Sequence, residues 1–510
     1  MAARPEPAES RRRGPPREGS PAVPTLTTHR SNLVLAVCCL AIVMVGVDIT
    51  ALNVALPAME RDLHASVSGM QWAIAAYSLA MATLMLCAGS TGDRIGRKRV
   101  LVAGIVVFTV ASVLCALAPS LSALIGFRIL QGVGAAGLSP VAMAIVANVF
   151  PGKQERTRAM GLWLGAYGIG LALGPVVGGV LVDAVGWRSV FWLNVPLGIV
   201  ALVIALLRVP ESRAERPRRP DPVGQLLVIT LLGPLAYGII EAPRAGWTAP
   251  HVIACFAVTV VSFVALLAYE RRRAEPLIEP AFFRDARFSG AIASLVAVFG
   301  TFGGFFFLTA LYLQNPLRMS ASEAGLWMLV PAGSLAVSSV CAAGLARRYG
   351  ARPLMVGAGV VLAASGMLIA LFTGDSSRVM IVVEYVLFGL GVGLSTPLII
   401  TAGVSGLPSD RAGLASGMLT TFGRSAFAMG VAALGAILNA GLHGAPLTDA
   451  AAFTSAVRPA WWILTAGGVV AALLGILVTR ERAASPPGPS PAPSAEQHVS
   501  GRPGPAERNG

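Results

Sequence analysis

Two opposite charges are unusual because they lie inside long apolar stretches. Asp48 interrupts the run 33–57, and Arg128 interrupts the run 121–149. A charge deep in a bilayer costs at least about 2.5–3.5 kcal/mol on insertion scales, so such residues normally face the interior of a helical bundle. At about 1.5 Å per helical residue, Asp48 and Arg128 would lie about 14 Å and about 10 Å from the same side of the membrane. They could form a fixed structural ion pair, or a pair that opens when Asp48 takes up a proton.

The apolar stretches that hold these charges are long enough to be membrane spans. The chain of 510 residues is 55% hydrophobic and only 13% charged. A run of about 20 apolar residues crosses a hydrocarbon core of roughly 30 Å, and a helix satisfies every backbone polar group within it. We therefore predict an all-α polytopic membrane protein. Its fourteen predicted helices span residues 33–57, 70–91, 99–118, 121–149, 158–182, 189–207, 223–243, 250–269, 288–312, 322–346, 352–373, 379–404, 411–440 and 459–479.

The basic residues indicate how these helices are oriented. Most of the 39 Lys and Arg residues lie in the tails 1–32 and 480–510 and in the loops after even-numbered helices. By the positive-inside rule, both tails are predicted to be cytoplasmic. Their polar, Pro-rich composition also predicts that they are disordered. The loops after odd-numbered helices hold only Arg61, Arg188, Arg244, Arg318, Arg378 and Arg458.

A weak internal repeat divides the chain into two halves. The segment "GVGAAGLSP" (132–140) matches "GLGVGLSTP" (389–397) in two glycines and the proline. The repeat predicts two six-helix bundles, 33–207 and 288–479, separated by residues 208–287 with two inserted helices and basic linkers. Internal repeats in a membrane chain are typical of secondary transporters, whose substrate site lies near the midplane between the halves.

Other classes of function are poorly supported. The six cysteines lie inside apolar runs without disulfide or zinc spacing, and the five histidines are scattered. No GxxxxGK[ST] loop is present, so we expect no nucleotide and no other cofactor. The basic residues sit in short loops rather than on one face with interleaved aromatics, which argues against nucleic-acid binding. We therefore expect neither an enzyme nor a metal site.

Five segments resemble signature motifs of one transporter family. They are "VDITALNVALP" (47–57), "GSTGDRIGRKRVL" (89–101), "LIGFRILQGVGAA" (124–136), "GLALGPVVGG" (170–179) and "WRSVFWLNVPLG" (187–198). Together with the predicted spans, they resemble the major facilitator superfamily, in its fourteen-helix drug:proton antiporter branch. The resemblance covers nearly all of residues 33–479.

The resemblance implies roles for several residues. A cytoplasmic latch between the halves would use Gly89, Asp93, Arg94, Gly96, Arg97 and Lys98. Asp93 could bind an opposing helix N-terminus, and the family's acidic partner at the end of 121–149 is replaced by Asn148, with Glu155 the nearest acid. The antiporter motif would comprise Gly170, Gly174, Pro175, Gly178 and Gly179, although close helix packing alone could explain these small residues. Asp183 lies at the end of a predicted span and is expected to be at the membrane interface.

The proton-coupling residues are predicted to be Asp48, Arg128 and Glu384. Glu384 lies next to Tyr385, the repeat counterpart of Arg128. It could bind a cationic substrate, carry a second proton or fill an interface. An ion pair between Glu384 and Arg424 is a further possibility that the sequence leaves open. A substrate cavity could be lined by Asn53, Trp72, Tyr77, Gln131, Tyr167 and Arg424.

The resemblance implies a secondary transporter that exports amphipathic drugs or antibiotics across the cytoplasmic membrane in exchange for protons. Its partners would be the lipid bilayer, protons and a small amphipathic substrate, and we expect a monomer. Proton-coupled uptake of a metabolite and a non-transporting membrane sensor are the alternatives. The predicted helix 322–346 has no acid in its interior, which disfavours dications and leaves neutral and monocationic substrates open.

Overall fold

The computed structural model describes residues 28–214, 220–273, 275–374, 377–405, 407 and 411–479. Residues 1–27 and 480–510 of the two predicted tails lie outside this part of the chain. All predicted site residues lie within it.

Fourteen helices in the described residues are long and apolar enough to cross a membrane, as predicted. The fourteen spans are formed by α1 (Thr28–Leu63), α2 (Val67–Ile95), α3 (Arg97–Ala116), α4 (Leu121–Val149), α5 (Lys153–Val185), α6 (Ser189–Trp192) with α7 (Asn194–Arg208), α8 (Pro222–Ala245), α9 (Pro250–Glu270), α10 (Ala286–Gln314), α11 (Ala321–Tyr349), α12 (Ala351–Phe372), α13 (Arg378–Val404), α14 (Ala412–Leu442) and α15 (Ala450–Val478). A short 3₁₀ turn, η1 (Pro280–Arg284), precedes α10.

Several helices extend beyond the predicted apolar runs. α5 begins at Lys153 rather than at 158. α15 begins at Ala450 rather than at 459. A side-chain cap supports the extension of α15: the Asp449 carboxylate accepts a hydrogen bond from the backbone N–H of Ala452, with N and O 3.0 Å apart. Hydropathy locates the membrane-embedded part of a helix but not the polar turns that extend it.

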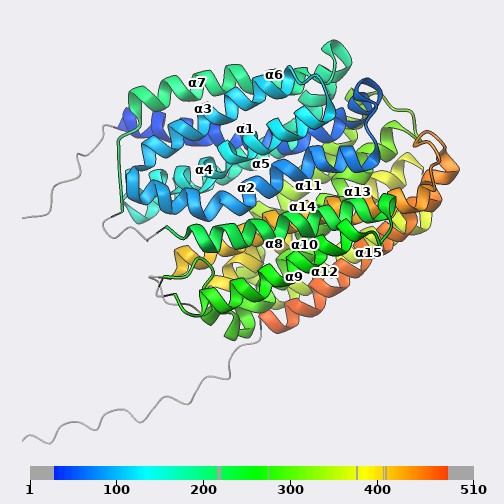
Figure 1. Cartoon of the computed structure of the whole chain (residues 1–510). Coiled ribbons are helices and arrows are strands. Elements are labelled where there is room, and N and C mark those ends of the chain that lie inside the picture. The colour runs from blue at the N-terminus through cyan, green and yellow to red at the C-terminus, as the bar shows by residue number, and fades with distance from the viewer. Residues whose placement is uncertain are drawn as a thin grey trace, which may run out of the picture.

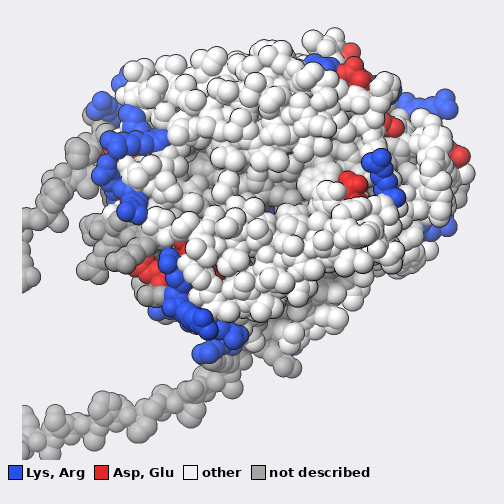
Figure 2. Space-filling model, in the orientation of Figure 1, with Lys and Arg blue, Asp and Glu red and all other residues white. Residues whose placement is uncertain are grey.

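The helices form two bundles, α1–α7 and α10–α15, with α8 and α9 beside them (Figure 1). α1 begins and α15 ends at the same end of the molecule, where Lys and Arg side chains gather (Figure 2). We call this the basic end and the opposite one the far end. Both ends of the described chain therefore lie on one side, as an even number of spans requires.

The bundles repeat the same helix contacts. A Cβ on Gly132 of α4 would lie 2.5 Å from a backbone oxygen of α2, and one on Gly134 would lie 2.5 Å from a backbone nitrogen of α3. Their counterparts Gly389 and Gly391 of α13 approach α11 and α12 at 2.2 and 2.9 Å in the same way. α2 and α3 are the second and third spans of one bundle, and α11 and α12 are those of the other. The repeat in the sequence is thus a repeat of backbone contacts.

The inserted helix α8 lies against the seam between the bundles. It packs with α2 of one bundle and α14 of the other, and the Gln225 side-chain amide of α8 donates to the Thr83 carbonyl of α2 at 2.6 Å. A small apolar cluster fills the three-helix contact, made by Ala75, Leu79, Ala236, Ile240, Ala428 and Ala432. The insert therefore covers the α2–α14 contact on its outer side.

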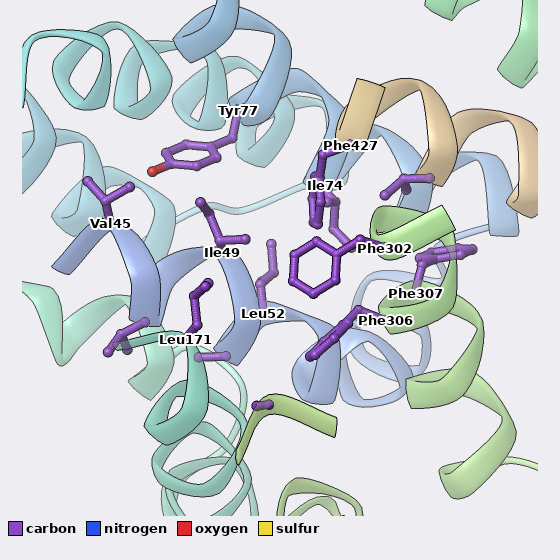
Figure 3. Close-up of a cluster of buried hydrophobic side chains, with 14 of the residues drawn as sticks. Val45, Ile49, Leu52, Ile74, Tyr77, Leu171, Phe302, Phe306, Phe307 and Phe427 are labelled. Atoms are coloured by element: carbon purple, nitrogen blue, oxygen red, sulfur yellow. The ribbon is translucent and has the colours of Figure 1, made fainter. Parts of the chain in front are cut away.

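Hydrogen bonds between the bundles gather toward the far end. The Gln314 side-chain amide of α10 donates to the Val54 carbonyl of α1 at 3.0 Å, and that of Gln71 on α2 donates to the Ala432 carbonyl of α14 at 2.7 Å. Apolar side chains of the two bundles also belong to one buried cluster (Figure 3), with Val45, Ile49, Leu52, Ile74, Tyr77 and Leu171 from α1, α2 and α5, and Phe302, Phe306, Phe307 and Phe427 from α10 and α14.

The contact between α5 and α11 opens toward the basic end. Near the far end, a Cβ on Gly325 of α11 would lie 2.2 Å from the Pro175 carbonyl oxygen. Gly168 and Gly161 follow Pro175 at heptad spacing toward the basic end, so they lie on nearly the same face of α5. A Cβ at either glycine would meet open space. The bundles are closed against each other at the far end and separate along this pair toward the basic end.

Candidate functional site

The two intramembrane charges singled out in the sequence form an ion pair. Arg128 Nη1 donates to Asp48 Oδ2 at 2.6 Å, and their side chains are 1% and 0% exposed. The pair joins α1 to α4 inside the first bundle. Removing both groups from water carries a large desolvation cost, and Coulomb attraction offsets it only when further hydrogen bonds satisfy the remaining polar atoms.

Those further hydrogen bonds come from neighbouring helices. The other Asp48 oxygen, Oδ1, accepts from the side-chain amides of Gln131 at 2.8 Å and Asn194 at 3.0 Å. Arg128 Nε donates to the Ala73 carbonyl of α2 at 2.9 Å, and Arg128 Nη1 also donates to Gln131 Oε1 at 2.7 Å. One buried carboxylate thus holds side chains from α4 and α7 against α1.

Aromatic rings enclose the guanidinium. The Arg128 Cζ atom lies 4.2 Å from the centroid of the Tyr77 ring and 5.7 Å from that of Phe191. Desolvated cation–π contacts of this kind contribute about 2 kcal/mol. The site is fully buried, which makes it sensitive to a change in charge. Protonation of Asp48 would remove the negative partner of Arg128 and weaken three charge-assisted hydrogen bonds.

The helix that carries Asp48 is packed tightly on the predicted antiporter motif. A Cβ on Gly170 would lie 2.7 Å from a backbone oxygen of α1, and one on Gly174 would lie 2.1 Å from the Thr50 hydroxyl. A Cβ on Gly178 would be 2.9 Å from the Ala51 side chain. On the next face, Gly179 and Pro175 touch α11 of the other bundle. α5 therefore connects the Asp48 helix to the far-end contact between bundles.

The predicted latch residues lie at the turn between α2 and α3. Arg97 donates to Asp93 Oδ1 through Nε at 2.9 Å and Nη2 at 2.8 Å, so Arg97 pairs with Asp93 rather than with Glu155. Gly96 has φ +127°, a conformation that favours glycine. Glu211 lies at the α3 N-terminus, where its Oε1 accepts from the Lys98 backbone N–H at 3.1 Å.

The same turn is bound to the segment that follows α7. The Arg97 backbone N–H donates to the Ser212 carbonyl at 2.9 Å, and Lys98 Nζ donates to the Leu206 carbonyl at 2.8 Å. Arg94 is exposed, and Gly89 packs near α4. In this arrangement, in which the bundles are closed at the far end, the charged turn contacts its own bundle and the segment that follows α7.

The residues predicted to line a substrate cavity lie in different parts of the molecule. Tyr77 and Gln131 belong to the ion-pair site, and Asn53 is buried one turn along α1, donating to the Ile49 carbonyl at 2.9 Å. Trp72 faces Tyr237 of α8, with ring centroids 6.1 Å apart, at the seam that the insert covers. A separate contact, Arg424 over Tyr167, joins the bundles, with the guanidinium carbon 4.8 Å from the ring centroid.

Glu384 is buried in the second bundle, away from the Asp48–Arg128 pair. Its backbone carbonyl accepts from the Ser365 hydroxyl at 2.7 Å, and its neighbour Tyr385 packs on Phe305. Arg424 lies over Tyr167 instead of pairing with Glu384. The described residues therefore do not show the Glu384–Arg424 pair that the sequence left open.

Two functional contacts carry little signal in the sequence. Asn194 lies within the quoted segment 187–198, but nothing in its spacing shows that it reaches Asp48. Asp183 at the end of α5 accepts from the backbone N–H groups of Ala321 at 3.1 Å and Ser322 at 2.8 Å, which caps the N-terminus of α11. Because backbone donors have no residue signature, a contact of this type cannot be predicted from residue types.

Comparison with known proteins identifies the fold and its group. The family model "Major Facilitator Superfamily" matches residues 38–431. The multidrug resistance protein Stp of Mycobacterium tuberculosis is 37% identical over 404 residues, covering 79% of this chain and 75% of Stp. The drug efflux pump JefA of the same species is 36% identical, with 82% of each chain covered.

A solved structure agrees in fold at low identity. The POT family transporter PepTSo superimposes with a TM-score of 0.66 at 15% identity, covering 89% of this chain and 98% of that one. The spans, the repeated bundles and these relatives agree. The chain therefore belongs to the major facilitator superfamily, among its fourteen-span drug efflux transporters.

Proposed function

We propose that this transporter exports amphipathic small molecules in exchange for protons by alternating access, with both termini in the cytoplasm. The positive-inside rule supports this orientation, because the basic end carries most of the Lys and Arg residues. The far end then faces outward. The described arrangement, closed at the far end, is the inward-facing state of the cycle.

The single observation that carries the proposal is the buried Asp48–Arg128 pair. A proton entering from outside would neutralise Asp48 and leave Arg128 without its counter-charge. Asp48 accepts from Arg128, Gln131 and Asn194, so its protonation changes contacts on α1, α4 and α7 together. One titratable group can in this way bias the packing of a whole bundle. Each net positive charge that moves inward across 100 mV supplies about 2.3 kcal/mol.

The antiporter motif supplies a route from the proton site to the gate. The glycines of α5 keep α1 and α5 in backbone contact, while Pro175 and Gly179 form the far-end contact with α11. A shift of α1 on protonation would therefore be passed to the α5–α11 contact. The turn at Gly89, Asp93, Arg94, Gly96, Arg97 and Lys98 acts as the cytoplasmic latch in the opposite, outward-facing state.

The direction of transport rests on similarity. The matched relatives are named as drug efflux or multidrug resistance proteins, which supports export rather than uptake of a metabolite. Glu384 is a buried acid within the spans of the second bundle and is the second proton site to test. Its burial in the other bundle, away from Arg128, places it outside the Asp48 network.

The test is a proton-flux assay in inside-out vesicles. Energised vesicles containing wild type, Asp48→Asn, Arg128→Ala or Glu384→Gln are challenged with a panel of amphipathic antibiotics and dyes, and the pH gradient is followed. A compound that dissipates the gradient with wild type and Glu384→Gln, but not with Asp48→Asn or Arg128→Ala, supports the proposal. Equal responses from wild type and Asp48→Asn would leave export standing and remove Asp48 as the coupling residue.

A further inference from the structure

Arg424 is a charge at the interface between the bundles that the proton site does not use. It projects from α14 of the second bundle onto Tyr167 of α5 in the first, with its guanidinium carbon 4.8 Å from the ring centroid. It also lies within electrostatic reach of Tyr77, the ring that stacks on Arg128. Because it touches the opposite bundle, Arg424 faces the space between the bundles rather than the lipid.

The position of Arg424 is deep in the membrane. It lies about 18 Å from the basic end of α14, a helix about 46 Å long. Its side chain is only half-buried, whereas Phe427, one turn closer to the far end, is 5% exposed. Phe427 belongs to the buried apolar cluster of Figure 3, and Arg424 is the charged residue one turn nearer the basic end of α14.

No acid neutralises this cation. Among the described residues, Arg424 forms no ion pair and no hydrogen bond, and its guanidinium lies over the Tyr167 ring. Asp48 is fully engaged by Arg128, Gln131 and Asn194, so that site is neutral as a whole. Glu384, 3% exposed, is buried in the second bundle. The accessible charge between the bundles is therefore positive.

The surroundings of this cation are aromatic. Tyr167 stacks on it, Phe427 follows it by one turn, and the Phe299 ring lies 3.6 Å from the Cβ position of the adjacent Gly423. A guanidinium binds sulfonate or carboxylate groups through paired N–H donors, and aromatic walls bind a flat apolar body. A positive charge in a low-dielectric environment attracts an anion strongly, interacts weakly with a neutral group and repels a cation.

We infer that Arg424 and Tyr167 form the substrate subsite and that it selects amphipathic aromatic anions. This inference rests on the proposed export function and narrows its substrate class. It differs from the expectation drawn from the sequence, which left neutral and monocationic compounds open. The anion would pair with Arg424 while its rings stack near Tyr167 and Phe427, and it would leave when the site opens outward.

The test uses three naphthalene probes that share the ring system and carry head groups of different charge. Naphthalene-2-sulfonate is a permanent anion, naphthalene-2-sulfonamide is neutral, and (2-naphthylmethyl)trimethylammonium is a permanent cation. Permanent charges prevent the probes from carrying protons through the lipid themselves. The full-length protein in proteoliposomes is assayed for proton-driven transport, and in detergent for equilibrium binding by probe fluorescence, as wild type and as Arg424→Gln, Arg424→Lys and Arg424→Glu.

Wild type should bind and transport the sulfonate about tenfold better than the cation, as a charge-assisted guanidinium contact requires. Arg424→Gln should lose that preference while sulfonamide transport stays within about twofold, which also shows that the variant is folded. Arg424→Lys should keep part of the preference, and Arg424→Glu should reverse it toward the cation.

Other outcomes overturn the inference in distinguishable ways. Proton-driven transport of the cation in preference to the sulfonate would leave export standing and refute the anionic subsite. An equal loss of all three probes in Arg424→Gln would assign Arg424 to the transport cycle instead of to recognition. Arg424-dependent sulfonate binding without any transport would support the subsite and refute the export proposal. Failure of wild type to bind the sulfonate would refute the subsite.

Discussion

The two bundles share a backbone plan but fill the same core position with opposite chemistry. In the first, the α1–α4 contact is the ion pair of Asp48 and Arg128, 2.6 Å apart. Aligning the repeated glycines places Tyr385 opposite Arg128, and the same offset places Phe305 opposite Asp48. Phe305 and Tyr385 do meet in the second bundle, edge to face, with ring centroids 5.4 Å apart.

A third position, found with the same alignment offset, also differs in chemistry between the two bundles. Gln131 bridges the ion pair, and its counterpart at the same offset is Phe388, which stacks on Phe305 with centroids 3.7 Å apart. A polar triad in one bundle thus corresponds to an aromatic triad in the other. The first can change its charge by taking up a proton, and the second cannot near neutral pH. The comparison teaches that the proposed switch at Asp48 has no titratable counterpart at the matching position of the second bundle.

The largest expected effect comes from removing the charge of the polar triad. Asp48→Asn should lower proton-driven export roughly 100-fold, because the amide cannot exchange a proton and leaves Arg128 uncompensated at a cost of about 3–5 kcal/mol. Phe305→Leu, the matched change in the aromatic triad, should lower thermal stability by about 1–2 kcal/mol but keep the coupling. Vesicle transport and thermal melting separate these effects. Loss of proton coupling in Phe305→Leu would contradict the proposal that coupling depends on the polar triad and not on the aromatic one.

A smaller effect is expected when the charge is kept but the geometry is changed. Arg128→Lys should reduce export roughly tenfold, because a single ammonium cannot serve Asp48, Gln131 and the Ala73 carbonyl together as the guanidinium fork does. Tyr385→Phe is the matched control in the other bundle and should transport at nearly the wild-type rate. Initial rates at saturating substrate measure both. Full activity in Arg128→Lys would show that charge alone, without the fork, is sufficient.

Where the bundles are alike, paired substitutions should have similar effects. Gly132→Ala and Gly389→Ala would each place a methyl group against a backbone oxygen of the neighbouring helix, at 2.5 and 2.2 Å. Overpacking of this kind costs about 1–3 kcal/mol. Melting temperatures of the purified variants should fall by comparable amounts. A large fall in one and none in the other would contradict the repeat of contacts described above.

The smallest effect is expected at the far end. Asp183→Asn should weaken the cap on α11, since a charge at a helix N-terminus contributes about 0.3–1 kcal/mol, and should lower the ratio of closed to open far ends by up to about fivefold. Spin–spin distances between labels on the far ends of α5 and α11 measure that ratio. Asp62→Asn is the control, because Asp62 bonds Arg188 within its own bundle. An equal shift in both variants would show that surface charge, not the cap, was responsible.

Much of the fold could be predicted because membrane spans have a strong signal. Fourteen apolar runs predict fourteen helices, and the repeated glycines predict two related halves; the close helix contacts at these glycines are a finding of the structure. Asp48 and Arg128 were found because an intramembrane charge is costly and therefore rare. Helix boundaries were less predictable, because α5 and α15 extend through polar residues that hydropathy ignores.

The rest of the site has partners that residue types do not specify. Asn194 reaches Asp48 because of the turn between α6 and α7, and Asp183 binds backbone groups that every residue possesses. Trp72 looked like a cavity residue, yet the inserted α8 places Tyr237 over it. Each of these contacts depends on how helices pack, which the pattern within one helix does not contain.

The central claim is that the transported proton binds in the first bundle, at Asp48. The most direct measurement is proton release from the purified protein in weakly buffered detergent solution when it binds a compound that wild type exports. At a pH where Asp48 of the substrate-free protein still carries its proton, wild type and Glu384→Gln should each release about one proton per bound substrate, because substrate binding shifts the protein toward the state with the ionised Asp48–Arg128 pair, and Asp48→Asn should bind the compound and release none. Proton release by Asp48→Asn equal to that of wild type would contradict the account.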